Sequence, residues 1–309
     1  MRQQQFLRSH IGFAVGAGLR PAPTWLFVSV LLFAGLSAWA WADDQIPFRV
    51  CLLEDNLPWS SRQQNSGFDL DTAKAVTEVM GRQLVPIWVK NDTRIMEVED
   101  SDFPTRRLSR NECDAIFSIP GPDAVKDSPK LTVGAPYYGA AFELIGRDGS
   151  VPASLKALRD HSVAVQSQTI ADFVLTAFGA KGRPFFSTEA ALADLATGKT
   201  TAALLWGPTA GWHLHTHPEL KLTFVAGYTP PAVVRWNEHV ATRKADAALR
   251  EAIDAALAQL TAAGTLKTLL ARYGIPFHAR FATIYSVAEM EKLRGQGSGV
   301  GGQGSGKRE

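Results

Sequence analysis

Two carboxylic acids and an indole follow an apolar run near residue 50 and could form one wall of a binding cleft. The run FRVCLLE (48–54) is typical of a strand, and Glu54, Asp55 and Trp59 lie at or just beyond its end. Carboxylates at a strand end can stay hydrated, which avoids the cost of burying a charge. Trp59 offers a flat apolar surface, with ligand contact and core packing as its two interpretations.

Two later apolar runs end in residues that belong to the same predicted cleft. Ligands of parallel α/β sheets bind beyond the carboxyl ends of the strands, where the connections diverge. The runs CDAIFSI (113–119) and TAALLWG (201–207) are typical of such strands. The residues at their ends are therefore candidate ligand contacts: Ser118, Pro120, Asp123 and Trp206.

Further candidates come from a helix start and from a longer strand. Gln168 and Thr169 precede a helical pattern, whose free N–H groups could hold an anionic or carbonyl group or could simply be capped. Tyr137 and Tyr138 are neighbours in a strand pattern, so we expect one to face the cleft and the other the core. Phe68 is either a second apolar wall of the cleft or part of the core. Tyr138, Phe68, Gln168 and Thr169 complete the predicted ligand contacts.

No pattern of a catalytic or metal site is present. The chain contains neither G-x-S-x-G nor H-E-x-x-H. The acidic segment 96–102 has ligands suited to a calcium-like ion, but a solvated loop is the simpler interpretation. His213, His215 and His217 have side chains suited to binding zinc, but the end of a surface helix is the simpler interpretation. We therefore expect no catalytic residue, no metal and no cofactor.

The composition is that of a globular protein with a sizeable core. Hydrophobic residues make up 46% of the chain and charged residues 20%. The formal net charge of +2 includes Arg2, Arg8 and Arg20, without which 29 basic and 30 acidic side chains remain. This near-neutral balance argues against a nucleic-acid partner and against electrostatic attachment to a membrane.

The first 42 residues have the pattern of a signal peptide. A basic region precedes the apolar run 25–36, which is too short to cross ~30 Å of hydrocarbon as a helix. Alanines at 38, 40 and 42 offer A-x-A cleavage sites, and we favour cleavage after Ala42 over an uncleaved anchor. The sequence therefore predicts a periplasmic protein that is not inserted in the membrane after cleavage.

Strand and helix patterns alternate in the two halves of the remaining chain. Such alternation indicates an α/β fold whose mainly parallel sheets are covered by helices. Gly81 and Gly264 mark helix ends, Ser187 a helix start, and Pro86 an edge strand. The predicted strands are 48–54, 83–89, 113–119, 136–147 and 201–207, with a further strand ending at 166; the predicted helices are 69–81, 103–112, 168–179, 187–199 and two within 246–274, with another starting at 154.

Two cysteines remain after the expected signal cleavage. Cys51 lies in the first strand and Cys113 at the start of another apolar run. An exported protein can oxidise its thiols, and a bridge is feasible if these strands are neighbours. We predict a structural disulfide, with two buried thiols as the alternative.

Several motifs resemble those of the family-3, type-2 periplasmic solute-binding proteins over residues 47–277. The match rests on NLPWS (56–60), GFDLD (67–71), PYY (136–138), LKALRDHSVAVQSQT (155–169) and AGTLKTLLARYG (263–274). The resemblance implies two lobes joined by two hinge strands that close on a ligand. It predicts lobe 1 from 43–140 and 228–285, lobe 2 from 141–227, and a flexible Gly/Ser-rich tail at 286–309.

A narrower resemblance concerns proteins of the MxaJ/XoxJ type, which accompany quinoprotein methanol dehydrogenases. It rests on NLPWS after a cysteine-bearing strand, on ECD (112–114) and on WGPTAGW (206–212). The segment 91–107 departs from that pattern. On this basis we expect a non-catalytic, monomeric accessory protein whose cleft holds a small molecule or a partner's peptide.

The two charged residues that bind the carboxylate and ammonium groups of amino-acid ligands in this superfamily are replaced in this sequence. Asp123 stands where an arginine binds the ligand's carboxylate, and Trp206 where an acid binds its ammonium group. A standard amino acid is therefore not the expected ligand. The alternatives are an ABC-transporter receptor for another solute, which would dock on a permease, and a dehydratase or lyase on the same fold.

Overall fold

A computed structural model describes residues 46–90, 103–147 and 151–286. All of them belong to one unit of chain contacts that spans Gln45–Glu309. The expected signal peptide, the acidic segment 96–102 and the tail beyond Ser286 lie outside the described residues. Within the described part of the chain, no helix is both long and apolar enough to cross a membrane.

A parallel strand pair opens the fold. Strand β1 (Pro47–Leu53) pairs with β4 (Gln83–Val89), and α1 (Phe68–Met80) connects them. Gly81 ends α1 in the left-handed conformation at φ 63°, as glycine permits without strain. Among the described residues β4 pairs with β1 alone, which agrees with the edge position indicated by Pro86.

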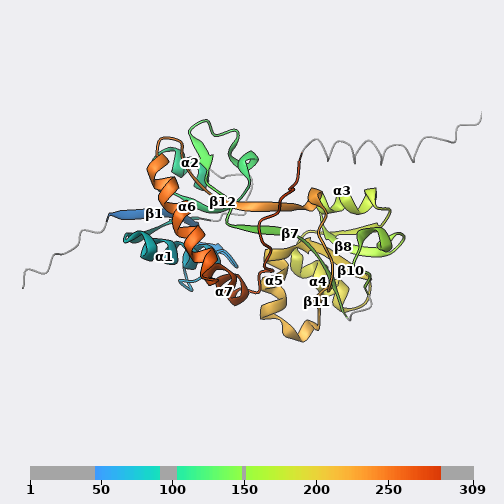
Figure 1. Ribbon diagram of the computed structural model, residues 1–309. Helices are drawn as coiled ribbons and strands as arrows, with labels where there is room; N and C mark the ends of the chain where they lie inside the picture. The colour runs from blue at the N-terminus through green and yellow to red at the C-terminus, as the bar shows by residue number, and fades with distance from the viewer. Residues whose placement is uncertain (1–45, 91–102, 148–150, 287–309) are drawn as a thin grey trace, which may run out of the picture. The chain divides into compact units, whose positions relative to one another are not determined.

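Eight strands form the larger sheet, in which β5, β12, β7, β10, β8 and β9 follow one another (Figure 1). A parallel bridge between Val50 and Ala115 connects β1 to the segment before β5. The strands are β5 (Ile116–Pro120), β6 (Leu131–Val133), β7 (Tyr138–Gly146), β8 (Ser162–Gln166), β9 (Lys181–Phe185), β10 (Ala202–Trp206), β11 (Thr223–Phe224) and β12 (Arg235–Arg243), and a short pair β2 (Asp55–Asn56) and β3 (Ser60–Ser61) stands apart.

Strand directions in this sheet are mixed. The pairs β8–β9 and β8–β10 are parallel, as expected of strands with helical connections. The long strands β7 and β12 run antiparallel to each other and to their other neighbours. The expectation of mainly parallel pairing therefore holds for the helix-connected strands and not for these two.

The remaining helices, except α5 (Gly207–Thr216), agree with the predicted ones in place and differ at their ends, whereas α5 was not among the predicted helices. They are α2 (Pro104–Ser109), α3 (Ile170–Ala177), α4 (Thr188–Ala196), α5 (Gly207–Thr216), α6 (Ala247–Ala262) and α7 (Thr265–Arg272). Ser187 caps α4 by accepting a hydrogen bond from the Ala190 N–H at 3.2 Å, as predicted. The helix expected from residue 154 is only a short 3-10 turn, Leu155–Leu158.

Separate hydrophobic cores form on the two sides of the β7–β12 pair. One core joins β1 and α1 to α6 and α7, and includes Phe48, Phe68 and Leu270. Another joins β8, α3 and the far half of β7, and includes Leu144, Val165 and Leu175. Each strand of the pair therefore passes from one core to the next.

Cys51 and Cys113 form the predicted disulfide. Their Cα atoms lie 5.6 Å apart, and the bridge joins β1 to the residues just before β5. Both cysteines are buried in a small core with Val89 and Leu108. The bond therefore covalently joins two adjacent parts of the fold.

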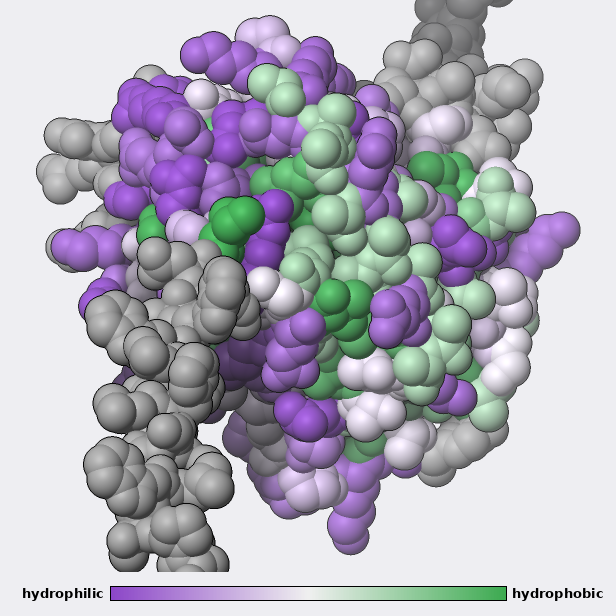
Figure 2. All heavy atoms as spheres, turned by 60° about the vertical axis from the view of Figure 1, so that its left-hand side comes forward, coloured by the Kyte–Doolittle hydropathy of each residue, from purple (hydrophilic) through white to green (hydrophobic). Residues whose placement is uncertain are grey.

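The face shown in Figure 2 mixes hydrophilic residues with weakly hydrophobic ones. Helix α6 contributes exposed alanines, among them Ala248, Ala255 and Ala258. Small apolar residues on a surface are normal for a globular protein and do not by themselves indicate a partner.

The segment after α7 runs along the β7–β12 pair. The Gly139 N–H donates to the His278 carbonyl at 3.0 Å, and His278 Nε2 lies 2.6 Å from Glu143 Oε1. Buried Asn237 donates through Nδ2 to the Phe281 carbonyl at 3.0 Å and accepts the Phe281 N–H through Oδ1 at 2.8 Å. Side chains of the strand pair thus hold residues 278–285 in place.

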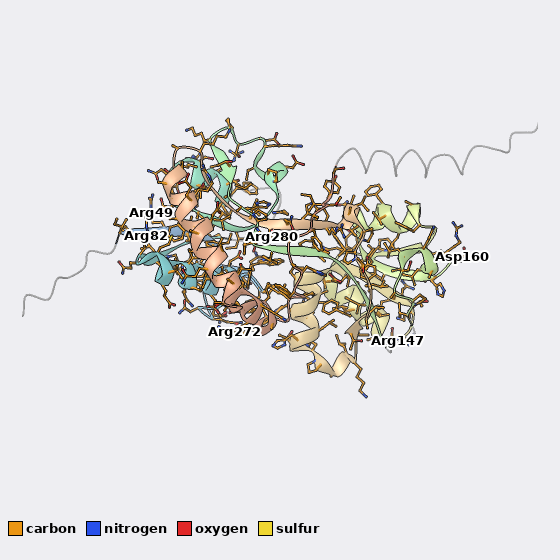
Figure 3. The ribbon with its side chains drawn as sticks, in the orientation of Figure 1. Arg49, Arg82, Arg147, Asp160, Arg272 and Arg280 are labelled. Atoms are coloured by element: carbon orange, nitrogen blue, oxygen red, sulfur yellow. A yellow bond between two sulfur atoms is a disulfide. The ribbon has the colours of Figure 1, made fainter. Side chains whose placement is uncertain are left out.

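Asn237→Ala is expected to destabilise the protein by about 1–3 kcal/mol, because both backbone groups of Phe281 lose their partner. Denaturant unfolding followed by tryptophan fluorescence measures this change. Arg280→Ala is the matched control, since Arg280 lies exposed in the same segment (Figure 3) and its loss should change little. Equal effects of the two substitutions would contradict the assigned role of Asn237.

Candidate functional site

A pocket of about 370 Å³ lies at the carboxyl ends of β1 and β5. Its walls are mostly apolar, and the disulfide forms part of them. The described lining residues are Cys51, Leu52, Leu53, Asn56, Trp59, Ser60, Asp69, Phe103, Pro104, Thr105, Ile116, Phe117, Ser118 and Ile119. This is the type of place at which α/β proteins bind small molecules.

Two predicted contacts, Trp59 and Ser118, line this pocket together. Trp59 is half-buried and also packs on the core around α1, which agrees with its core interpretation, while its role as a ligand contact remains a prediction. The Ser118 backbone lies in the left-handed region at φ 51°, which is uncommon for serine. Backbone strain of this kind is held by surrounding contacts and is frequent at binding sites.

A chain of hydrogen bonds holds Ser118 in that conformation. Its backbone N–H donates to the Tyr137 hydroxyl oxygen at 3.0 Å. That oxygen lies 3.2 Å from Ser118 Oγ, which donates to Asp69 Oδ1 at 2.6 Å. The Tyr138 hydroxyl also approaches Ser118 Oγ, at 3.4 Å. Asp69, near the start of α1, is therefore connected to β5 and to the start of β7.

Asp69 and Glu238 are buried acids, with 8% and 2% of their surface exposed. Burial raises the pKa of Asp69 to about 7, and the Ser118 hydrogen bond partly opposes this. Burial and the charge of Asp69 raise the pKa of Glu238, on β12, to about 8. Glu238 Oε2 is buried without a hydrogen-bond partner among the described residues. Burial also raises the pKa values of Tyr137 and Tyr138 well above the usual range.

Tyr137 and Tyr138 do not divide between cleft and core as expected. Both are buried in the same core, with ring centroids 4.9 Å apart. The alternation of a strand does not apply because β7 begins only at Tyr138. Phe68 is fully buried and packs edge-on against Tyr138 at 5.3 Å, which favours its core interpretation.

Glu54 and Asp55 line a different, open depression together with Ser61, Arg62 and Gln63. Glu54 Oε1 pairs with Arg62 Nη1 at 2.5 Å. The acids quoted for the opening strand are thus near the pocket in sequence but do not line it. We predicted them as cleft residues because they follow β1. In the structure, however, the chain enters strand β2 at Asp55 and pairs with β3 instead of continuing along the pocket.

Pro120, the last residue of β5, and Asp123, which lies beyond its end, are both exposed. Asp123 lies in a short 3-10 helix (Pro122–Val125) and is not among the residues that line the pocket. Asp123 therefore contributes no charged group to the described lining of the pocket. The predicted exchange of charge at residue 123 therefore remains a prediction.

The other predicted contacts lie beyond the β7–β12 pair. Thr169 Oγ1 donates to the Gln166 carbonyl at 2.8 Å just before α3, and exposed Gln168 has a positive φ of 63°. Trp206 is half-buried at the end of β10, and its ring packs against Phe142 at 5.4 Å and Trp236 at 5.6 Å. Trp206 contacts the cores on both sides of the strand pair.

The histidines of α5 have acidic neighbours. His213 Nε2 lies 3.1 Å from Glu189 Oε1, and His217 Nδ1 lies 2.9 Å from Glu219 Oε1. Burial lowers the pKa of His213, and Glu189 opposes this. Among the residues with a described position, no group of His, Cys, Asp and Glu has the arrangement of a metal site.

Sequence analysis missed Asn56, Ser60, Asp69 and Phe103 as pocket residues. Asp69 had a visible signal, since it is the first acid of the GFDLD motif and precedes the apolar face of a helix. Its contact with Ser118 joins residues 49 positions apart in sequence. Local pattern does not reveal such a contact.

Solved structures of binding proteins share this fold. The unliganded open L-cystine solute receptor of Neisseria gonorrhoeae matches with a TM-score of 0.63 at 17% identity, covering 75% of this chain and 94% of that one. A substrate binding domain of a putative amino acid ABC transporter from Streptococcus pneumoniae gives 0.60 at 22% identity, covering 74% and 99%. MxaJ from Methlophaga aminisulfidivorans MPT gives 0.52 at 20% identity, also covering 74% and 99%. These likenesses confirm the expected fold class, that of type-2 periplasmic binding proteins.

Sequence comparison identifies the family. None of the curated proteins matches the chain. The model of the bacterial extracellular solute-binding proteins, family 3, matches residues 48–276, which is most of the chain and includes both cores and the pocket. The chain therefore belongs to the bacterial extracellular solute-binding proteins, family 3.

Proposed function

We propose that this protein is a non-catalytic binding protein that takes a small organic molecule into the pocket at the ends of β1 and β5. The observation that carries the proposal is the pocket itself, with apolar walls and polar groups from Asn56, Asp69 and Ser118. Pockets of this composition, with few polar groups that orient the ligand, are typical of small-molecule sites.

The proposal includes export and a two-lobed arrangement. Residues 1–42 act as a signal peptide, and the mature protein works in the periplasm. Residues 43–140 with 228–285 form lobe 1, and 141–227 form lobe 2. The strands β7 and β12, which pass between hydrophobic cores, are the natural hinge. Closure brings Trp206, Gln168 and Thr169 toward the ligand.

The ligand is not a standard amino acid. No arginine is among the described residues that line the pocket, so a carboxylate has no bidentate partner there. Asp123 and Trp206 stand where the resemblance places the two charged clamps of amino-acid binders. An apolar or cationic molecule suits the described lining better.

We further propose that the protein assists a quinoprotein alcohol dehydrogenase, as the MxaJ/XoxJ-type resemblance implies. Support comes from the NLPWS loop beside a disulfide-linked strand and from WGPTAGW at the end of β10. Size-exclusion chromatography with a purified quinoprotein methanol dehydrogenase tests this role. A stable complex supports it, and independent elution of the two proteins contradicts it.

The second candidate is a receptor that delivers a solute to an ABC permease. The pocket favours it, because a receptor needs a concave site for its solute. Tight ligand binding accompanied by closure, measured by small-angle scattering with and without ligand, supports the receptor. A protein that remains open and binds the dehydrogenase supports the accessory role.

Trp59→Ala and Trp206→Ala are expected to weaken ligand binding by at least tenfold, about 1.4 kcal/mol, while the protein stays folded. Both indoles lose apolar contact with the ligand, Trp59 in the pocket and Trp206 on closure. Titration calorimetry with a ligand found by thermal-shift screening measures the loss. Trp88→Ala is the control, because Trp88 is a half-buried tryptophan on β4 outside the pocket lining. Unchanged affinity in both variants would remove this site assignment.

A further inference from the structure

Asp69 is the ionisable side chain among the described residues that line the pocket. Its Oδ1 atom accepts the Ser118 hydroxyl, and no hydrogen bond from a described residue reaches Oδ2. The backbone N–H of Asp69 is bound to the Trp59 carbonyl at 2.9 Å, which fixes the start of α1 beside the indole. One carboxylate oxygen at the pocket is thus left for another partner.

The surroundings of Asp69 are acidic and lack a cation. Ser118, Tyr137, Tyr138 and Glu238 are the groups that interact with it from β5, the β7 region and β12. Glu238 has a buried oxygen without a partner, so two acids share this region with no described counter-charge. Buried charges are normally paired. A cation in the pocket would supply the missing charge.

We propose that the ligand is a small organic cation, an amine with an apolar body, whose ammonium group is bound by Asp69. The walls formed by Leu53, Ile116 and Phe117 accommodate the apolar body. Trp59 also lines the pocket, and its indole is suited to attract a cation through a cation–π interaction. An anion would meet a carboxylate with no opposing cation. This inference rests on the proposed function and narrows its ligand class.

The test uses ligands matched in carbon skeleton. Amines, alcohols and carboxylates from butyl to benzyl are titrated calorimetrically into the full protein at pH 8. We expect an amine to bind at least tenfold more tightly than the matching alcohol, and the carboxylate most weakly. An alcohol or carboxylate that binds as tightly as its amine overturns the cation assignment but leaves the pocket as a solute site. Absence of binding by every series removes both proposals.

Asp69→Asn separates the charge from the shape of the side chain. The amide oxygen can still accept the hydrogen bond from the Ser118 hydroxyl, but the negative charge is lost. We therefore expect the affinity for the amine to fall at least tenfold and the affinity for the alcohol to stay unchanged. Glu54→Gln is the matched control, because Glu54 directly follows β1, whose end forms part of the pocket, but lies outside the pocket lining. Equal losses in the two variants, or no loss in Asp69→Asn, would overturn the role of Asp69.

Proton release gives an independent measurement. An amine remains protonated between pH 6 and about 8, whereas Asp69 has a pKa of about 7 when the pocket is empty. A bound cation favours the carboxylate, so binding near pH 7 releases a proton and becomes tighter as the pH rises. Calorimetry in buffers of different ionisation enthalpy detects this release. Proton uptake, or affinity that falls with rising pH, contradicts an ammonium–carboxylate contact.

Discussion

Replacing both Cys51 and Cys113 by alanine is expected to lower the free energy of unfolding by about 4 kcal/mol, one of the two largest effects on stability that we predict. The bridge closes a loop with a sequence separation of 62, and its loss returns that loop's conformational freedom to the unfolded chain. Alanine avoids burying new polar atoms in a core that excludes water. Denaturant unfolding at pH 7 measures the change.

Reduction provides the control for this effect. Dithiothreitol should destabilise the native protein by a similar amount and leave the Cys51→Ala/Cys113→Ala variant unaffected. The two samples can be compared only if their m-values, the slopes of the unfolding free energy against denaturant concentration, are equal. A more compact unfolded state would change the m-value. An unchanged unfolding midpoint in the double variant would show that the disulfide has no structural role.

Substitution of the buried acids has the other large expected effect on stability, and its size depends on pH. The pKa values of Asp69 and Glu238 rise from 3.8 and 4.5 to about 7 and about 8 on folding. The unfolded chain therefore loses these protons first, and their contribution to stability falls as the pH rises from about 4 to 8. The combined Asp69→Asn/Glu238→Gln variant should gain several kcal/mol of stability relative to the native protein as the pH rises from 5 to 8, because the two raised pKa values together span about five pKa units of that range at about 1.36 kcal/mol each.

Asp71 is the matched control for Asp69, because both acids lie in the first turn of α1. The hydroxyl of Tyr273 donates to its Oδ2 atom at 2.7 Å, Arg272 at 3.0 Å, and Lys74 pairs with Oδ1 at 2.9 Å (Figure 3 labels Arg272). These bonds outweigh the opposing effect of burial and lower its pKa. Asp71→Asn should therefore destabilise the protein at pH 7 and lose its effect as the pH falls below the ordinary Asp range. The same pH trend in both variants would contradict the assignment of the buried acid pair.

In an ion-pair network next to the disulfide, the pKa of a carboxyl group is lowered, in contrast to the raised pKa values of Asp69 and Glu238. Asp114 accepts hydrogen bonds from the Arg49 guanidinium and from Arg243, and these lower its pKa against the effect of burial (Arg49 is labelled in Figure 3). Asp114 directly follows Cys113, so the network and the disulfide fasten the same segment to β1. This segment is a structural junction, in contrast to the acidic pair of the pocket.

Local signals in the sequence determined where most elements lie and where some of them begin or end. Gly81 and Gly264 adopt the left-handed conformation at helix boundaries, and Ser187 caps its helix, because these preferences depend on the residue and its nearest neighbours. The exposed strand β9 (Lys181–Phe185) was missed because KGRPF has no apolar alternation. Its parallel pairing with β8 is a long-range contact, which local sequence pattern does not reveal.

The candidate site divides in the same way. The strand-end rule identified Trp59 and Ser118, because the end of a strand is readable from the pattern of apolar residues. The ion pair of Glu54, the burial of Tyr138 and the contact of Asp69 with Ser118 were decided only by the tertiary structure. Hydrophobic pattern and turn chemistry act over a few residues, whereas the pairing of an acid is set by whichever distant segment packs against it. The sequence by itself thus determined the family, most of the elements and the disulfide partners, and the fold alone decided which carboxylate lines the pocket.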